Sequence, residues 1–250
     1  MTWSVAAHWV LETLWPRRCP GCGASAALPG ADWCPGCAGE LAVLVGRSYC
    51  PTCGGDTSGL LIRNGRCPGC QRLHLRHSEL VRVGPYAGPL QSAIISFKYR
   101  HNRRLDRILA HLLWAALQGR SYFEQVDLIV PVPSHWSRRV ARGYDHVALL
   151  AGQLAALSGK PLGRALKAGK RVRPQVGLSR EARFDNVRGA FRVAGWVGGW
   201  KGNVCLVDDV TTTGATLHEA AATLGRAGLN RIGAAVVAKA TIPGDRPSLM

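Results

Sequence analysis

Four Cys-x-x-Cys pairs near the start of the chain constrain its fold more than any other feature of the sequence. They are Cys19/Cys22, Cys34/Cys37, Cys50/Cys53 and Cys67/Cys70. One such pair on a tight turn presents two thiolates to a metal ion, and a second pair completes the tetrahedral coordination that Zn²⁺ prefers. The first two pairs supply one four-sulfur site and the last two supply another, while the similar spacer lengths leave a cross-braced pairing open. The sequence therefore predicts two zinc sites.

These zinc sites are expected to be structural. A redox role for the cysteine pairs would need a βαβ setting, which this Gly- and Pro-rich segment lacks. So short a segment cannot bury enough apolar surface to fold alone, and four thiolates leave no coordination position open for a substrate. The remaining cysteine, Cys205, stands in an apolar run and is expected to be a buried, small hydrophobic side chain.

The composition changes near residue 77, where the paired cysteines end and longer apolar runs begin. We predict an N-terminal helix over residues 1–18, a double zinc ribbon over 19–76 and an α/β domain over 77–250. The apolar stretch Trp3–Trp15 is too short to span a bilayer, and its basic residues follow it, unlike those of a secretory signal. We expect a cytoplasmic protein without a transmembrane segment, its first helix docked on the body or, alternatively, lying on a membrane surface.

Short apolar runs alternate with helical patterns in the second part of the chain. The expected strands are Leu80–Tyr86, Leu128–Val132, Val204–Val207 and Ile232–Val237. The expected helices are Leu90–Leu117, interrupted by the basic patch Lys98–Arg107, then Tyr144–Leu157 and Ala215–Ala227. Strands that alternate with helices indicate βαβ units, so we predict an α/β fold with a mainly parallel sheet and flanking helices.

The segment that follows the strand Val204–Val207 has the composition of a phosphate-binding element. Its candidate binding residues are Asp208, Asp209, Thr211, Thr212, Thr213, Gly214, Ala215 and Thr216. Ligands of open α/β sheets bind beyond the carboxyl ends of strands, and a glycine before a helix N-terminus lets backbone N–H groups approach a phosphate. The carboxylates can accept hydrogen bonds from the vicinal hydroxyls of a ribose or face a magnesium ion. A plain strand–turn–helix would explain one threonine and the glycine, but not the two acids and three successive threonines.

These residues carry a resemblance to known proteins. The sequence VDDVTTTGAT resembles the phosphoribosyl pyrophosphate signature of type I phosphoribosyltransferases, in which the acids hold the ribose hydroxyls and the loop holds the 5′-phosphate. Together with PRRCPGCG, FKYRHNRRL, VPVPSHWSRRVARGYDHVALLA and RPQVGLSREARFDNVRGAF, it resembles the ComF family, which places a double zinc ribbon before a phosphoribosyltransferase-like domain. The resemblance implies binding of phosphoribosyl pyrophosphate, or a related ribose 5-phosphate ligand, with magnesium.

The resemblance also carries expectations about individual segments. Members of the family commonly have Phe-Asn-Gln where this chain has Tyr144-Asp145-His146, which puts polar contacts from the last two positions in doubt. The segment Phe184–Phe191 resembles a block that lies over the site as a hood, where its aromatic residues either stack on a base or anchor a surface loop. Pyrophosphate contacts are predicted for three arginines. Alternatively, these arginines lie on the solvent-exposed start of a helix. They are Arg138, Arg139 and Arg142.

Three functions fit these features. The chain is a phosphoribosyltransferase for an unknown acceptor, a sensor that binds the ligand without turnover, or a factor that handles incoming single-stranded DNA in natural transformation with a helicase-like partner. The last role follows from the resemblance, and a net charge of +17 agrees with a polyanionic partner. No nucleophile or general base stands out in the sequence, but phosphoribosyl transfer needs none from the protein. We expect a ComF-type protein that binds the ligand and single-stranded DNA, with catalysis left open.

Overall fold

The computed structural model describes residues 18–25, 31–60, 62–99, 104–133, 144–169 and 178–241. The predicted N-terminal helix over Trp3–Trp15 lies outside these ranges. The same holds for the predicted pyrophosphate contacts Arg138, Arg139 and Arg142.

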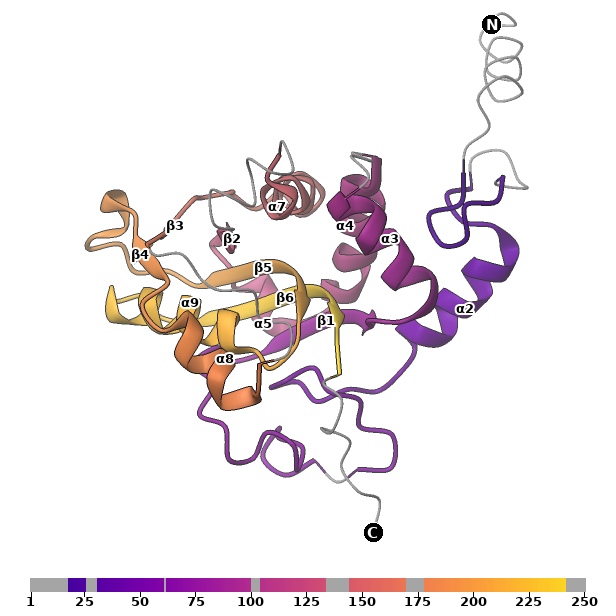
Figure 1. Cartoon of the computed structure of the whole chain (residues 1–250). Coiled ribbons are helices and arrows are strands. Elements are labelled where there is room, and N and C mark those ends of the chain that lie inside the picture. The colour runs from indigo at the N-terminus through magenta and orange to yellow at the C-terminus, as the bar shows by residue number, and fades with distance from the viewer. Residues whose placement is uncertain are drawn as a thin grey trace, which may run out of the picture.

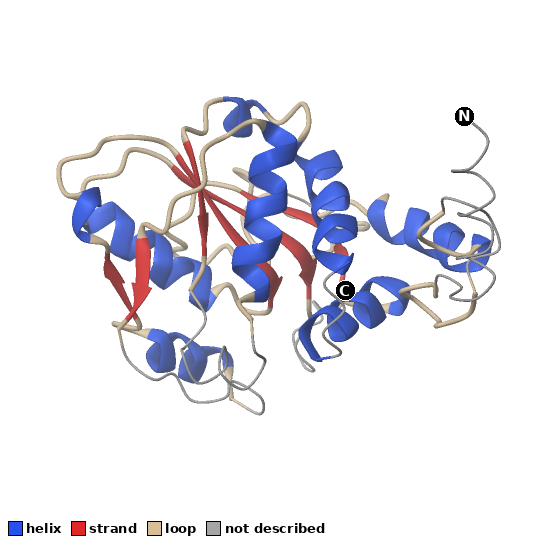
Figure 2. Cartoon of the chain, turned by 90° about the horizontal axis from the view of Figure 1, so that it is seen from above, coloured by secondary structure: helices blue, strands red, loops and turns tan. Residues whose placement is uncertain are grey.

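The main sheet has four parallel strands in the order β1-β6-β5-β2. Its strands are β1 (Leu80–Pro85), β2 (Leu128–Pro131), β5 (Val204–Thr211) and β6 (Ile232–Lys239). Because parallel neighbours need crossover connections, helices cover both faces of this sheet (Figures 1 and 2). The α/β fold with a parallel sheet and flanking helices, predicted from the alternating pattern, is confirmed.

Alternate residues of the strands build two separate cores. On one face Cys205 and Val207 of β5 pack with the helices α3 (Gly88–Tyr99), α4 (Arg104–Leu117) and α7 (His146–Ser158). On the other face Val204 and Leu206 pack with α9 (Ala215–Arg226). This alternation follows from the period of two residues in a strand, and it makes Cys205 fully buried, as expected.

The central strand β5 is longer than the sequence predicts. Its pairing with β6 continues through Asp208, Val210 and Thr211, so both acids lie inside the strand rather than after it. The long helical stretch Leu90–Leu117 is divided into α3 and α4, and α7 begins at His146 instead of Tyr144. These differences arise because tertiary pairing and capping, rather than local propensity, set where an element ends.

Six of the described elements were not predicted from the sequence. The helix α2 (Pro35–Val45) begins directly after Cys34, with Pro35 in the first turn, where its missing N–H costs nothing. The strands β3 (Leu166–Ala168) and β4 (Phe191–Val193) form a small antiparallel sheet. The short helices α5 (Ser121–Glu124), α8 (Arg180–Val187) and η1 (Gly195–Val197) complete the described elements. None of the described helices has the length and apolar composition needed to cross a membrane.

Candidate functional site: two cysteine clusters and a phosphate-type loop

The eight paired cysteines form two clusters, and each cluster takes its sulfurs from neighbouring pairs. Cys19, Cys22, Cys34 and Cys37 form the first cluster, and Cys50, Cys53, Cys67 and Cys70 form the second. The sulfur atoms of each cluster lie within 4.8 Å of one another. The pairing is therefore sequential and not cross-braced, which answers the question that the spacers left open.

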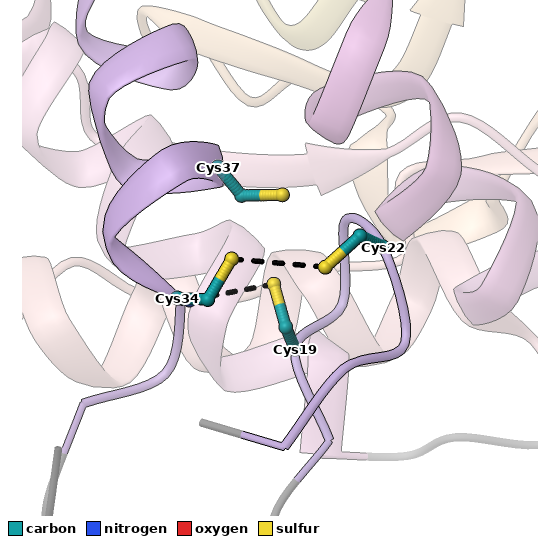
Figure 3. Close-up of side chains that lie close together, drawn as sticks. All are labelled: Cys19, Cys22, Cys34 and Cys37. Carbon is teal, nitrogen blue, oxygen red and sulfur yellow. Dashed lines mark hydrogen bonds between the residues drawn. The ribbon is translucent and has the colours of Figure 1, made fainter. Parts of the chain in front are cut away.

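The sulfur separations match a tetrahedral zinc site. Zn–S bonds of about 2.3 Å give tetrahedral edges of about 3.8 Å. The Cys22–Cys34, Cys50–Cys70 and Cys53–Cys67 sulfurs each lie 3.6 Å apart. In the first cluster, shown in Figure 3, the backbone N–H of Cys34 donates to the Cys19 sulfur over 3.4 Å. Burial alone would raise the pKa of Cys19, but N–H groups of this kind outweigh it and lower that pKa to about 6, which favours the thiolate that zinc binds.

The second cluster is built into the body of the molecule. Cys50 and Cys70 are fully buried, whereas Cys22 of the first cluster is exposed. The turn between Cys50 and Cys53 accepts two hydrogen bonds from the segment that leads into β1. Leu80 N–H donates to the Pro51 carbonyl over 2.7 Å, and His77 Nε2 lies 2.9 Å from the Thr52 carbonyl. We call the segment Cys50–Cys70 the second ribbon, and it contacts the sheet through these bonds.

The segment Thr211–Thr216, which we call the phosphate loop, joins β5 to α9. Gly214 has a φ of +82° and occupies the N-cap position of α9, a conformation that other residues adopt only with strain. The first N–H groups of α9 lack partners from their own helix, and the helix dipole adds positive potential at the same point. One of them, Ala215 N–H, donates to the Thr213 hydroxyl over 3.3 Å. The loop therefore has the geometry that helix-terminal phosphate sites use.

Two cations hold the phosphate loop in place. Arg183 of α8 donates to the Thr212 hydroxyl over 3.0 Å, and the Lys239 ammonium at the end of β6 donates to the Thr212 carbonyl. On its other side the loop approaches the segment that leads from the second ribbon into β1, because a Cβ atom at Gly214 would lie 3.7 Å from Leu75 and 4.0 Å from His77. The sequence did not single out Arg183 or Lys239, since neither belongs to the loop's own segment.

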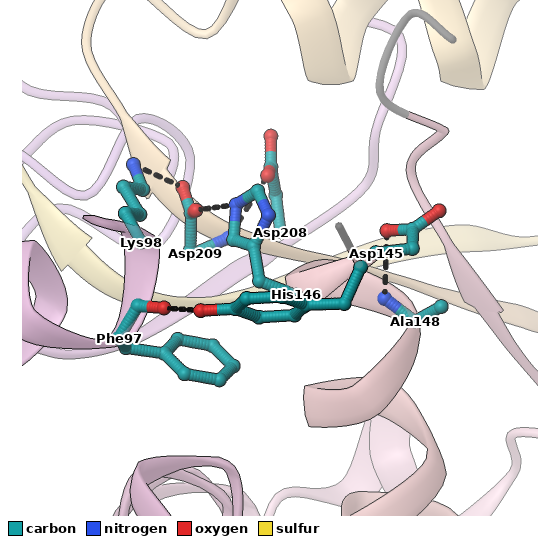
Figure 4. A network of polar contacts seen from close by, with 8 residues as sticks. Phe97, Lys98, Asp145, His146, Ala148, Asp208 and Asp209 are labelled. Carbon is teal, nitrogen blue, oxygen red and sulfur yellow. Dashed lines mark hydrogen bonds and ion pairs between the residues drawn. The ribbon is translucent and has the colours of Figure 1, made fainter. Parts of the chain in front are cut away.

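The acidic pair lies on β5, where neighbouring residues point to opposite faces of the sheet. Asp209 is buried and contacts two side chains: Lys98 Nζ at 2.8 Å from Oδ1, and His146 Nε2 at Oδ2 (Figure 4). Asp208 is partly exposed, and its Oδ1 accepts a hydrogen bond from the Asp209 N–H over 2.9 Å.

The two carboxyl groups have opposite pKa shifts. Burial would raise the pKa of Asp209, but the charge of Lys98 and the hydrogen bond from His146 hold it well below its usual range. Burial and the neighbouring charge of Asp209 raise the pKa of Asp208 to about 8. The pair therefore carries its negative charge mainly on Asp209.

The residues Tyr144-Asp145-His146 make polar contacts that their departure from the family pattern put in doubt. Asp145 caps α7 by accepting a hydrogen bond from Ala148 N–H over 3.2 Å, and His146 contacts Asp209. The Tyr144 hydroxyl donates to the carbonyl of Phe97. A capping aspartate is favoured at this position, so the substitution keeps the helix start and gives Asp209 a buried partner.

The hood segment is anchored to the body by its aromatic residues. Phe191 is buried, and Phe184 packs edge-on against His218 of α9 with 5.4 Å between ring centroids. The two phenylalanines therefore anchor the segment, as one of the two interpretations expects, but the segment is not a loop throughout, because Phe184–Val187 belongs to α8 and Phe191 begins β4.

Sequence comparison agrees with both parts of this structure. Residues 10–71 match the family described as "Double zinc ribbon domain". The chain is 34% identical to "Competence protein F" of Haemophilus influenzae over 171 residues, which are 66% of this chain and 75% of the relative. It is 33% identical to "DNA utilization protein YhgH" of Salmonella typhimurium, over 65% of this chain and 72% of that protein. It is 29% identical to "Competence protein ComFC" of Bacillus subtilis, over 62% and 64%.

Two solved structures have a partial likeness to this chain. One is glutamine phosphoribosylpyrophosphate amidotransferase from B. subtilis, with a TM-score of 0.39 and 18% identity. The likeness covers 57% of this chain and 30% of that protein. Orotate phosphoribosyltransferase from Aeropyrum pernix has a TM-score of 0.34, 20% identity and coverage of 58% and 76%.

The sheet, the phosphate loop and the two cysteine clusters define a parallel α/β protein with a helix-terminal phosphate-type loop that carries a double zinc ribbon with two four-cysteine sites suited to zinc. Within that class, the chain belongs to the ComF family of competence proteins, because it matches three quarters of a family member at 34% identity.

Proposed function

We propose that the phosphate loop binds phosphoribosyl pyrophosphate or a related ribose 5-phosphate ligand. The observation that carries the proposal is the backbone of the loop: a glycine with φ +82° caps the twelve-residue helix α9 at the carboxyl end of β5. A phosphate dianion fits the N–H groups at this helix start, and the threonine hydroxyls add neutral hydrogen-bond donors. In this proposal the sugar of the ligand lies toward the end of β5 that carries Asp208 and Asp209.

Magnesium fits the same proposal through the chemistry of its ligands. Mg²⁺ prefers carboxylate and phosphate oxygens and keeps several waters, and the partly exposed Asp208 would supply such an oxygen once it has lost its proton. A bound cation favours this ionised form, because it offsets the charge of Asp209 that raises the pKa of Asp208. The ion would neutralise charge on a bound pyrophosphate group. Arg138, Arg139 and Arg142 remain the proposed contacts for that group, as the sequence predicts.

Replacement of Gly214 by alanine tests the binding proposal. We expect calorimetric titration with phosphoribosyl pyrophosphate and Mg²⁺ to show binding to the wild type and affinity at least about tenfold lower for Gly214→Ala, because the loop must leave its left-handed conformation or store strain.

Gly228→Ala provides a matched control. Gly228 lies past the opposite end of α9, also has a positive φ (+94°), and like Gly214 would accept a Cβ without a close contact. It should lose a similar amount of stability, about 1 kcal/mol, and keep its affinity. Equal affinity of the two variants for the ligand would refute the site, and no heat from the wild type would refute the ligand.

A role in DNA uptake is proposed on separate evidence. The names of the relatives describe competence and DNA utilisation, and the chain has a net charge of +17. Such a charge attracts nucleic acid through counterion release. We propose that the protein acts in the cytoplasm on incoming single-stranded DNA, with a helicase-like partner, and that its first helix either docks on the body or reaches the membrane surface.

Single-strand binding is expected to depend steeply on salt. Fluorescence anisotropy with a labelled oligonucleotide should show a linear fall of log K with log salt, and Arg103→Ala with Arg104→Ala should reduce the slope by about 1.4, or about 0.7 per lost phosphate contact. Binding should survive Gly214→Ala, because the DNA surface and the phosphate loop are proposed to be distinct. A slope near zero for the wild type would contradict the proposal.

Transfer to an acceptor is the alternative function of the same site. Exchange of labelled pyrophosphate with phosphoribosyl pyrophosphate would detect turnover without knowledge of the acceptor. Binding without exchange would favour a sensor or a structural ligand over an enzyme.

A further inference from the structure

The two acids next to the phosphate loop have different surroundings, although they are neighbours in the sequence. The side chain of Asp209 is only 6% exposed, and both of its oxygens are engaged. One contacts Lys98 from the last turn of α3, and the other contacts His146 from the first turn of α7 (Figure 4). Asp208 is partly exposed, and its carboxylate accepts a hydrogen bond from the backbone N–H of Asp209.

The pleat of β5 explains this difference. Cys205 and Val207, at odd positions, pack with α4 and α7, and Val204 and Leu206, at even positions, pack with α9. Asp209 continues the first series and Asp208 the second. The two carboxylates therefore leave the strand on opposite sides, and the ion pair of Lys98 and the hydrogen bond of His146 drawn in Figure 4 both go to Asp209.

The contacts of Asp209 form a fixed arrangement of three distant segments. Lys98 and His146 are themselves mostly buried, with side chains 17% and 5% exposed. Phe97, beside Lys98, packs edge-on against His146 with 5.8 Å between ring centroids, and the Tyr144 hydroxyl donates to the Phe97 carbonyl. The buried ion pair of Lys98 and Asp209 is costly to open, because removal of one partner leaves the other charged and desolvated.

We propose that Lys98 and His146 are positioning residues that hold Asp209 inside the protein, so that Asp208 is the one carboxylate of the pair that accepts the sugar hydroxyls. The inference rests on the proposed function, which supplies the ribose 5-phosphate ligand. It replaces the expectation that both acids contact the sugar. Asp209 then acts through the strand, by fixing the position from which Asp208 and the phosphate loop extend.

A pair of isosteric variants separates the two roles. Displacement titrations would compare ribose 5-phosphate with 2-deoxyribose 5-phosphate, which lacks one of the hydroxyls, and the wild type should prefer the former by at least about tenfold. Asp208→Asn should reduce that preference to near unity and change the melting temperature by less than about 2 °C. Asp209→Asn should keep the preference within about twofold and lower the melting temperature by roughly 5–10 °C.

Variants of His146 provide the conservative rescue. His146→Leu should lower the melting temperature and the ligand affinity, because Asp209 loses a donor and turns toward the site. His146→Gln keeps an N–H donor, so its melting temperature and its ligand affinity should each recover about two thirds of what His146→Leu loses. If Leu and Gln give the same values as the wild type, His146 does not position Asp209.

The outcomes distinguish this inference from the proposed function. Loss of the hydroxyl preference in Asp209→Asn, alone or together with Asp208→Asn, would overturn the division of roles while leaving the ligand site intact. If the wild type bound neither sugar phosphate, the proposed function would fail and the sugar-facing role of Asp208 with it. The thermal comparison of the Asp209 and His146 variants would still decide whether these side chains stabilise one another.

Discussion

Cys50→Ser is expected to remove one equivalent of zinc and to destabilise the whole α/β body, not only the second ribbon. Zinc bound to four thiolates contributes on the order of 10 kcal/mol to the folding of small domains, and a three-sulfur site retains only part of it. Cys50 is fully buried, and the turn that it begins accepts hydrogen bonds from Leu80 N–H and contacts His77. Loss of this turn exposes the edge from which β1 starts. We expect a fall in the melting temperature of more than 10 °C, or failure to fold.

Cys22→Ser is the matched control for this prediction. It removes one sulfur from the first cluster, whose Cys22 is exposed, so it should also lose zinc while the sheet keeps most of its stability. Native mass spectrometry would count the zinc ions, and thermal melts followed by circular dichroism would compare the variants. If both variants lost one zinc and melted together, the second ribbon would not be part of the body. A chelator titration of the wild type gives the same comparison if Cys50→Ser does not fold.

The contacts of the second ribbon extend the consequence to the ligand. His77 lies against the turn of the ribbon through Thr52 and approaches Gly214 of the phosphate loop, where Leu75 also packs. Arg180 of α8 donates to the Gly69 carbonyl of the ribbon over 3.2 Å, and Arg183 of the same helix donates to Thr212 over 3.0 Å. The second ribbon therefore supports the loop from two directions, and its loss should weaken ligand binding as well as stability.

The sequence predicts the parts of this structure that depend on local spacing. The Cys-x-x-Cys pairs are local features, so the two zinc sites could be predicted, but their pairing depends on how the turns approach one another in space. The strand before the acids could likewise be predicted from its apolar run. Its continuation to Thr211 could not, because aspartate and threonine are included through pairing with Val236, Ala238 and Lys239 of β6.

The partners of the acidic pair lie beyond what the sequence alone can indicate. Lys98 and His146 are 111 and 63 residues away from Asp209 in the sequence. Each belongs to a basic or polar segment whose side chains could equally well be exposed to solvent. A buried charge must be compensated, but the sequence does not say which charge is buried. The substitution of histidine at position 146 is the one signal that could have drawn attention to this contact.

Asp56→Ala is the second change for which we expect a large effect. Arg82 lies on β1 with a side chain only 1% exposed, and the Asp56 carboxylate of the second ribbon pairs with its Nη2. The Tyr49 ring lies 5.0 Å from the guanidinium, and Arg82 Nε has no hydrogen-bond partner among the described residues. Removal of Asp56 leaves a buried cation without its carboxylate, which typically costs about 3 kcal/mol or more.

The melting temperature of Asp56→Ala should therefore fall by at least about 6 °C. Asp185→Ala removes a carboxylate from the Arg188–Asp185 pair, whose side chains are 80% and 69% exposed, and it should change stability by less than about 1 kcal/mol. The double change Arg82→Met with Asp56→Ala should recover most of the loss, since an apolar side chain needs no counter-ion at this position. Equal melting temperatures for Asp56→Ala and Asp185→Ala would show that the second ribbon is not held to the sheet by this ion pair.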